Sequence, residues 1–129
     1  MTIWRFSVAA VVCACGFALP GSASAADLAG TWTLNIPAAN STWTFTQATP
    51  TTPQFSATCV ISGRITYTYS LTGATVGPLV IAVEQEAVNN NAAIPIGLLI
   101  GTVQNSTLTG TVIYTTLTTA SVTGTKSGG

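Results

Sequence analysis

The sequence contains no histidine, and charged residues make up only 5% of its 129 residues. Enzymes move protons and form covalent intermediates mainly with His, Asp, Glu, Lys and Cys side chains. The chain therefore lacks the residues needed for a Ser-His-Asp triad or a zinc centre. It also contains no phosphate-binding loop and no dinucleotide motif. These absences predict a protein that is not an enzyme and that has no catalytic residues, no metal ligands and no cofactor.

The N-terminus has the three parts of a secretory signal peptide. Residues 1–5 end in Arg5, the apolar run 6–19 follows, and residues 23–25 provide the small side chains that signal peptidase requires. The apolar run is shorter than the roughly 20 residues that a membrane-spanning helix needs. We therefore interpret residues 1–25 as a signal peptide and expect a secreted or periplasmic protein.

Cleavage after Ala25 leaves residues 26–129, which is enough chain for one domain and contains no membrane span. A loose lipobox that ends at Cys15 gives an alternative, in which the protein is lipid-anchored at that residue. Loss of the leader also leaves Cys59 as the single cysteine, so no internal disulfide can form. We expect Cys59 to be a small buried core residue, because no histidine is available to activate its thiol. Pairing of Cys59 between chains stays open.

The mature chain carries little net charge. Two cationic residues and three acidic residues give a net charge of −1, and they are Arg64, Lys126, Asp27, Glu84 and Glu86. Binding to nucleic acid needs a basic patch, so the charge predicts no nucleic-acid partner. The hydrophobic content of 47% is normal for a folded domain, and the remaining polarity comes mainly from Thr, Ser, Asn and Gln.

After the leader, apolar and polar residues alternate with the period of two that is typical of β-strands. Trp32, Leu34 and Ile36 alternate with Thr and Asn, and Trp43 and Phe45 alternate with Thr. We expect the two tryptophans to be buried on one inner face. The pattern predicts about eight strands separated by turns. They span residues 31–36, 42–47, 55–61, 65–71, 79–85, 94–103, 108–114 and 117–126, with a turn at 73–78.

A short element recurs along the chain: an apolar residue, any residue, glycine, and then Thr or Ala. Its glycines are Gly30, Gly73, Gly101, Gly110 and Gly124. Glycine within strands permits the sharp coiling of small barrels. The charged residues that protect open sheet edges are nearly absent, which also favours a closed sheet. The sequence therefore predicts an all-β fold, a small antiparallel meander barrel, with a β-sandwich as the alternative.

Residues 28–32 read LAGTW, just after the predicted signal peptide and at the opening of the first predicted strand. This stretch resembles the start of calycin-type small barrels, namely lipocalins, avidin-like proteins and the small secreted metalloprotease-inhibitor barrels of bacteria. The resemblance covers about residues 26–36 and implies the barrel fold. It does not extend to ligands, because the Thr-Asp-Tyr motif of lipocalins is absent. Trp32 and Trp43 are also too few to build an avidin biotin site, and Cys59 alone cannot form the inhibitors' disulfide.

Four aromatic residues are predicted to bind a ligand at the barrel mouth: Trp32, Trp43, Tyr67 and Tyr69. The alternative is that they fill the core, because small barrels are packed with side chains.

Glu84 and Glu86 are two residues apart, so they share one strand face with Cα atoms about 6.6–7 Å apart. Paired carboxylates can hydrolyse glycosides, and together with the amides of Asn89–Asn91 they could hold a hard cation. No third catalytic group accompanies them. We therefore expect a solvated strand end. Without histidine, we expect little change of stability between about pH 5 and 8, with Glu84 and Glu86 as the exception, because two neighbouring like charges can raise one pKa.

These observations together predict a secreted, non-enzymatic binding module for a small apolar ligand or a protein partner. The alternative is a self-associating cell-envelope or extracellular structural protein that pairs through its strand edges. A homo-oligomer is compatible with both hypotheses.

Overall fold

The computed structural model describes residues 26–36 and 40–128, so the predicted signal peptide and Cys15 lie outside the described residues. The described part forms a single meander of eight strands. They are β1 (Gly30–Leu34), β2 (Ser41–Thr46), β3 (Gln54–Ile61), β4 (Tyr67–Val76), β5 (Leu79–Val88), β6 (Ile94–Gln104), β7 (Thr107–Tyr114) and β8 (Thr119–Gly128). No helix within these ranges is long and apolar enough to cross a membrane.

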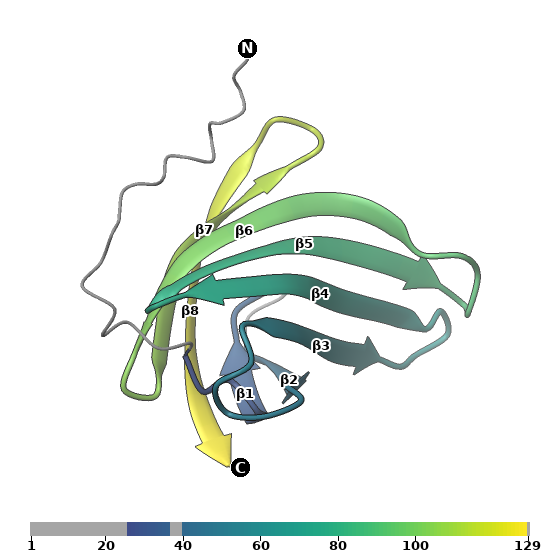
Figure 1. Cartoon of the computed structure of the whole chain (residues 1–129). Coiled ribbons are helices and arrows are strands. Elements are labelled where there is room, and N and C mark those ends of the chain that lie inside the picture. Colours follow the sequence, from purple (N-terminus) through teal and green to yellow (C-terminus); the bar gives the residue numbers. More distant parts are fainter. Residues whose placement is uncertain (1–25, 37–39, 129) are drawn as a thin grey trace.

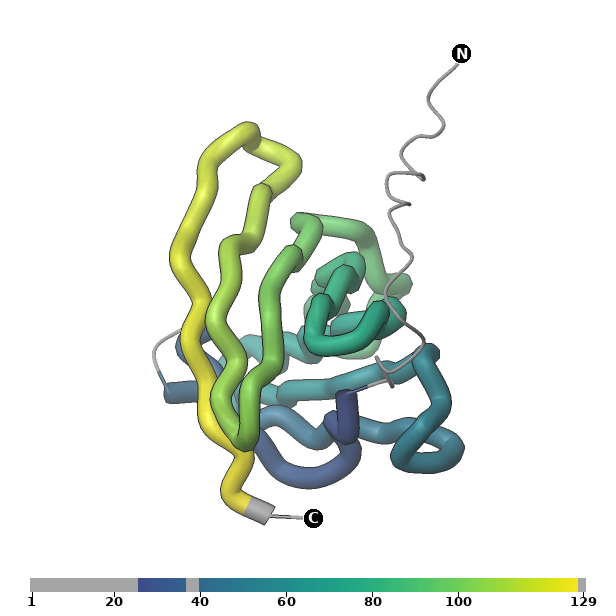
Figure 2. Tube along the Cα trace, turned by 60° about the vertical axis from the view of Figure 1, so that its left-hand side comes forward, coloured from purple at the N-terminus to yellow at the C-terminus, as the bar shows by residue number. Residues whose placement is uncertain are grey.

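The sheet is a closed barrel. Each strand pairs antiparallel with the next, and β8 pairs with β1 to close the ring (Figure 1). The view in Figure 2 shows β6, β7 and β8 side by side, from green to yellow. The predicted all-β meander barrel is confirmed, and the β-sandwich alternative is wrong.

The strand alternation buries apolar side chains inside the barrel and turns threonines outward. Trp32 on β1 lies directly opposite Trp43 on β2, and both side chains are almost completely buried. Each indole N–H has a partner: Trp32 donates to the Leu28 carbonyl at 2.8 Å and Trp43 to the Ile36 carbonyl at 2.6 Å. The expected burial of the two tryptophans is confirmed. The core also includes Phe45, as the same alternation predicts.

The turn predicted at residues 73–78 is wrong in its extent. Strand β4 continues through Gly73, and only Gly77 and Pro78 form the turn, with Gly77 at a φ of 57°. Gly73 stays in the strand because β5 passes very close to it. A Cβ atom at Gly73 would collide with the Ile81 carbonyl oxygen and with Ala82.

A second close approach joins β6 and β7, where Gly101 and Gly110 lie opposite each other. A Cβ atom at Gly110 would be 2.5 Å from the Ile100 carbonyl oxygen, and one at Gly101 would be 2.8 Å from the Thr109 carbonyl oxygen. Glycine therefore permits the tight coiling of the barrel here, as the recurring glycine element predicts.

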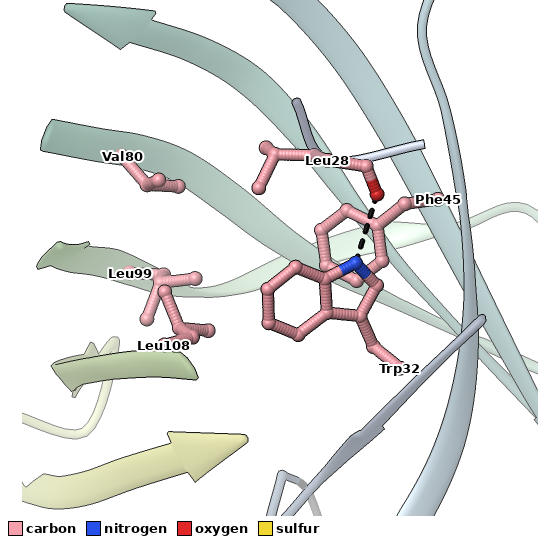
Figure 3. Close-up of a pocket in the computed structure, with 6 residues that line it drawn as sticks. All are labelled: Leu28, Trp32, Phe45, Val80, Leu99 and Leu108. Carbon is pink, nitrogen blue, oxygen red and sulfur yellow. Dashed lines mark hydrogen bonds between the residues drawn. The ribbon is translucent and has the colours of Figure 1, made fainter. Parts of the chain in front are cut away.

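One end of the barrel is closed by the segment that precedes β1. The Leu28 side chain is buried, and its backbone N–H donates to Oε1 of Gln47 at 2.7 Å. Figure 3 shows Leu28 beside the Trp32 indole that donates to its carbonyl. The apolar side chains at this end leave no room between them for a water molecule, and they are Leu28, Trp32, Phe45, Val80, Leu99 and Leu108. We call this end of the barrel the plugged end, and its side chains belong to the hydrophobic core.

Candidate functional site

The opposite end of the barrel concentrates the polar side chains of the interior. It is the end where β3 and β5 finish, at their arrowheads in Figure 1, and where β4 and β6 begin. All three tyrosines of the sequence and both glutamates lie there, on strand positions that face inward. We call this set, Tyr67, Tyr69, Glu84, Glu86 and Tyr114, the tyrosine end.

Strand register places Tyr69 between Cys59 on β3 and Glu86 on β5. The Tyr69 hydroxyl donates a hydrogen bond to Glu86. Burial raises the pKa of Tyr69, and its hydrogen bond to Glu86 raises it further. The ring of Tyr69 stacks on that of Tyr67, with centroids 6.1 Å apart. Tyr69 is 8% exposed, whereas Tyr67 and Glu86 are half-buried and therefore lie nearer to the mouth.

The next row, deeper in the barrel, runs from Glu84 on β5 through Gly97 on β6 to Tyr114 on β7. Gly97 has no side chain, and a Cβ atom there would be 3.2 Å from Cδ1 of Tyr114, so the tyrosine ring lies over the glycine. The pairing of β5 with β6 also shifts register between Glu84 and Gln85. Such bulges are common at barrel rims and beside functional sites, where they redirect side chains.

Glu84 is fully buried, with 0% of its surface exposed, and neither carboxyl oxygen has a hydrogen-bond partner. Its pKa is raised to about 7, first because burial removes water from the carboxylate and second because Glu86 is close. The expected solvated strand end is therefore wrong at Glu84. The same alternation that buries Val80 and Ala82 also places Glu84 inside. The spacing of Val80, Ala82 and Glu84 in the sequence already indicated that Glu84 faces inward.

The structure separates the four predicted ligand-binding residues. Trp32 belongs to the plugged end. Trp43 is 0% exposed, and its indole N–H is bonded within the protein, so both tryptophans act as core residues. Tyr67 and Tyr69 lie at the tyrosine end, where they stay candidate ligand residues. Tyr114 was not among the predicted site residues. Strand register brings it near Glu84, because both residues lie opposite Gly97.

Cys59 is a free thiol and is 3% exposed, so its predicted place in the core is confirmed. Burial raises the pKa of the Cys59 thiol, which keeps it protonated and a poor nucleophile at neutral pH. Asn89 does not turn toward the glutamates, because its Oδ1 accepts a hydrogen bond from the Thr66 backbone N–H at 2.9 Å. Within residues 26–36 and 40–128, no three His, Cys, Asp or Glu side chains group in a way that could hold a metal ion.

Comparison with known proteins adds no family to this picture. A scan against protein-family models found no match, and neither did searches of curated proteins and of solved structures. The features that bear on function are the closed eight-stranded antiparallel barrel and its acidic, aromatic end.

Proposed function

We propose that this protein is a secreted, non-enzymatic binding barrel that takes a small ligand at its tyrosine end. One observation carries the proposal: Glu84 is fully buried, and both of its carboxyl oxygens lack a partner. A buried polar group without a hydrogen bond costs about 1–3 kcal/mol, so folded proteins keep few of them. A ligand that bonds to Glu84 would remove this cost in the bound state.

The difference between the two ends supports the same proposal. The plugged end has no space for a ligand, since its apolar side chains are packed together. At the tyrosine end, Tyr67, Glu86 and Tyr114 are only half-buried, so a ligand at this mouth would contact these side chains in front of Glu84. The calycin-type resemblance belongs to this proposal, because barrels of that kind hold small ligands inside the sheet.

Binding fits the two glutamates better than hydrolysis does. Glycoside hydrolysis needs two carboxyl groups on either side of the scissile bond. Glu84 and Glu86 instead lie one behind the other along β5, the first fully buried and the second half-buried. A ligand that enters from the mouth would contact Glu86 first and Glu84 second, and it would not lie between the two carboxyl groups.

The second candidate function, self-association, has one observation in its favour. The outer face of β5, β6 and β7 carries Ile81, Val83, Ile100 and Ile113, each about 40% exposed. Each described strand pairs on both sides over part of its length. Self-association would therefore use this face or a short unpaired stretch, such as residues 119–122 of β8, which pair with β7 but not with β1. Light scattering over a hundredfold range of concentration separates the candidates. A binding barrel keeps a constant mass, and a structural subunit grows.

The binding proposal is tested with three probes of one shape but different charge: benzylammonium, benzyl alcohol and benzoate. Each is titrated into the ¹⁵N-labelled mature protein. We expect at least one to shift the backbone amide signals of Tyr69, Glu86 and Gly97 while leaving those of Leu28 and Trp32 in place. If no probe shifts the signals of the tyrosine end, or if shifts occur only on the outer face, the proposal fails.

A further inference from the structure

We propose that the tyrosine end selects ligands that carry a small organic cation, such as an ammonium group, and that the Glu84 carboxylate receives it. This inference rests on the proposed function and specifies its ligand class. The apolar ligand expected from the sequence becomes an amphipathic one, with an apolar body against the aromatic rings and a cation against the carboxylate.

The first argument is the uncompensated negative charge. Two of the three acidic residues in the whole sequence, Glu84 and Glu86, lie at this end. Among the described residues the cationic side chains are Arg64 and Lys126, and neither forms an ion pair with a glutamate. Arg64 is exposed in the segment between β3 and β4, and Lys126 is paired with Asp27 at 3.9 Å. A buried carboxylate is normally paired when it is ionised, so a cation would supply the partner that the ionised form of Glu84 lacks among the described residues.

The second argument is the chemistry of the walls. Tyr67, Tyr69 and Tyr114 present aromatic faces and phenol oxygens, and both attract organic cations. The hydroxyl of Tyr69 is directed at Glu86, so it does not satisfy the oxygens of Glu84. A neutral ligand would leave the Glu84 oxygens without a charged partner. An anion would be repelled by both glutamates.

Binding of a cation to Glu84 is coupled to release of a proton. The free carboxyl has a pKa of about 7, and a bound cation favours its ionised form. The other titratable groups that face Glu84 are Glu86 on the same strand, Tyr69 on β4, Tyr114 on β7 and Cys59 on β3. The pKa values of both tyrosines and of the cysteine are raised, so these groups stay protonated at neutral pH. The affinity for a cation should therefore fall about tenfold per pH unit below pH 7 and level off above it.

The test measures dissociation constants of benzylammonium, benzyl alcohol and benzoate for the wild type, Glu84→Gln and Asp27→Asn. The Asp27→Asn variant is the matched control, because it also removes one negative charge but lies outside the site, where Asp27 is 56% exposed. We expect the wild type to bind benzylammonium at least tenfold more tightly than benzyl alcohol, with benzoate weakest. Glu84→Gln should lose this preference, and Asp27→Asn should keep it.

The outcomes separate the inference from the proposed function. If benzyl alcohol or benzoate binds at the tyrosine end as tightly as benzylammonium, the barrel is a binding module but the inferred ligand class is wrong. If none of the three binds, the proposed function fails and the inference fails with it. A pH series on the wild type is independent of whether Glu84→Gln folds. A benzylammonium affinity that is unchanged between pH 5.5 and 7.5 would contradict the role of Glu84.

Discussion

Glu84 makes the stability of this fold depend on pH through a single side chain. Its folded pKa of about 7 lies above its ordinary value of 4.5. Between these two values the folded state holds more protons than the unfolded state, so the free energy of unfolding declines as the pH rises. The decline begins near pH 4.5 and is complete above pH 7. The Glu84 and Glu86 pair is thus the exception to nearly constant stability from pH 5 to 8 that the sequence indicates, with burial of Glu84 rather than the charge of Glu86 as the larger cause.

The Glu84→Gln variant removes the charge and keeps the shape of the side chain. At pH 8 we expect it to raise the free energy of unfolding by about 2 kcal/mol, after allowance for screening by nearby solvent. At pH 4.5 we expect little difference, since the wild-type carboxyl is protonated there. Urea denaturation at several pH values measures this. Asp27→Asn is the control, because it also removes one negative charge but at a position that is 56% exposed. Stability curves of wild type and Glu84→Gln that stay parallel from pH 4.5 to 8 would contradict the assignment.

At the level of single residues, the sequence predicts which side chains face inward. It predicts less well which other residues those side chains contact. The alternation in β5 contains the signal that Glu84 faces inward, since Val80 and Ala82 precede it at the same spacing. The position of Tyr114 could not be predicted in this way. It depends on the pairing register of β5, β6 and β7, which places Glu84 and Tyr114 on either side of Gly97, and the alternation within one strand does not specify which residues of neighbouring strands pair.

Among the structural elements, the pair of β6 and β7 depends on glycine at the point where the strands approach most closely. Gly110→Ala places a methyl group 2.5 Å from the Ile100 carbonyl oxygen, and neither backbone can yield without breaking ladder hydrogen bonds. We expect a loss of about 3 kcal/mol or more in the free energy of unfolding. Gly63→Ala is the matched control, because its methyl group would meet only the Ile65 carbonyl oxygen at 3.7 Å. If thermal and urea unfolding give the same loss of unfolding free energy for both variants, β6 and β7 do not approach each other as closely as described.

One side chain, Gln47, holds the N-terminal segment in place at the plugged end through hydrogen bonds. Its Oε1 accepts from the backbone N–H groups of Leu28 and Ala29 at 2.7 and 3.2 Å, and its Nε2 donates to the carbonyls of Ala26 and Thr52 at 3.0 and 2.8 Å. It therefore ties the N-terminal segment to the loop after β2.

Gln47→Ala leaves these backbone groups without partners, and we expect a loss of about 2 kcal/mol. Amide hydrogen exchange should quicken at Leu28 and Trp32 and stay slow at Tyr69. Gln54→Ala, at an exposed position in β3, serves as the control and should change little. Equal exchange at Leu28 in both variants would show that Gln47 does not hold the plug.

Strand boundaries could be predicted where the turn contains residues with strong turn preferences. They could not be predicted where a glycine lies within a strand to allow close approach of a neighbouring strand. The two-residue turn at Asn105 and Ser106 follows from turn residues, with Asn105 at a φ of 58°. At Gly73 the same kind of residue lies inside β4, because the requirement there is a close approach of β5 rather than a turn. A glycine in the sequence does not distinguish these two uses.

At the scale of the whole molecule, closure of the sheet and the contrast between the two ends define the protein. The meander and the low charge made a closed barrel predictable from the sequence. The concentration of all three tyrosines and both glutamates at one end follows from that meander, because the start of β4 and the ends of β5 and β7 lie at the same end of the barrel. The proposed binding function would give the buried Glu84 carboxyl a partner, which a purely structural role would not.

The protonation of Glu84 tests this interpretation most directly. Glu84 and Glu86 are the only glutamates in the sequence, so a ¹³C NMR titration of selectively labelled protein gives two side-chain carboxyl signals, which Glu86→Gln assigns. Glu84 should titrate with a midpoint near pH 7 in the free protein. Benzylammonium should move that midpoint to lower pH. A midpoint near the ordinary value of 4.5, unchanged by benzylammonium, would mean that Glu84 is solvated, and the proposed site would not exist.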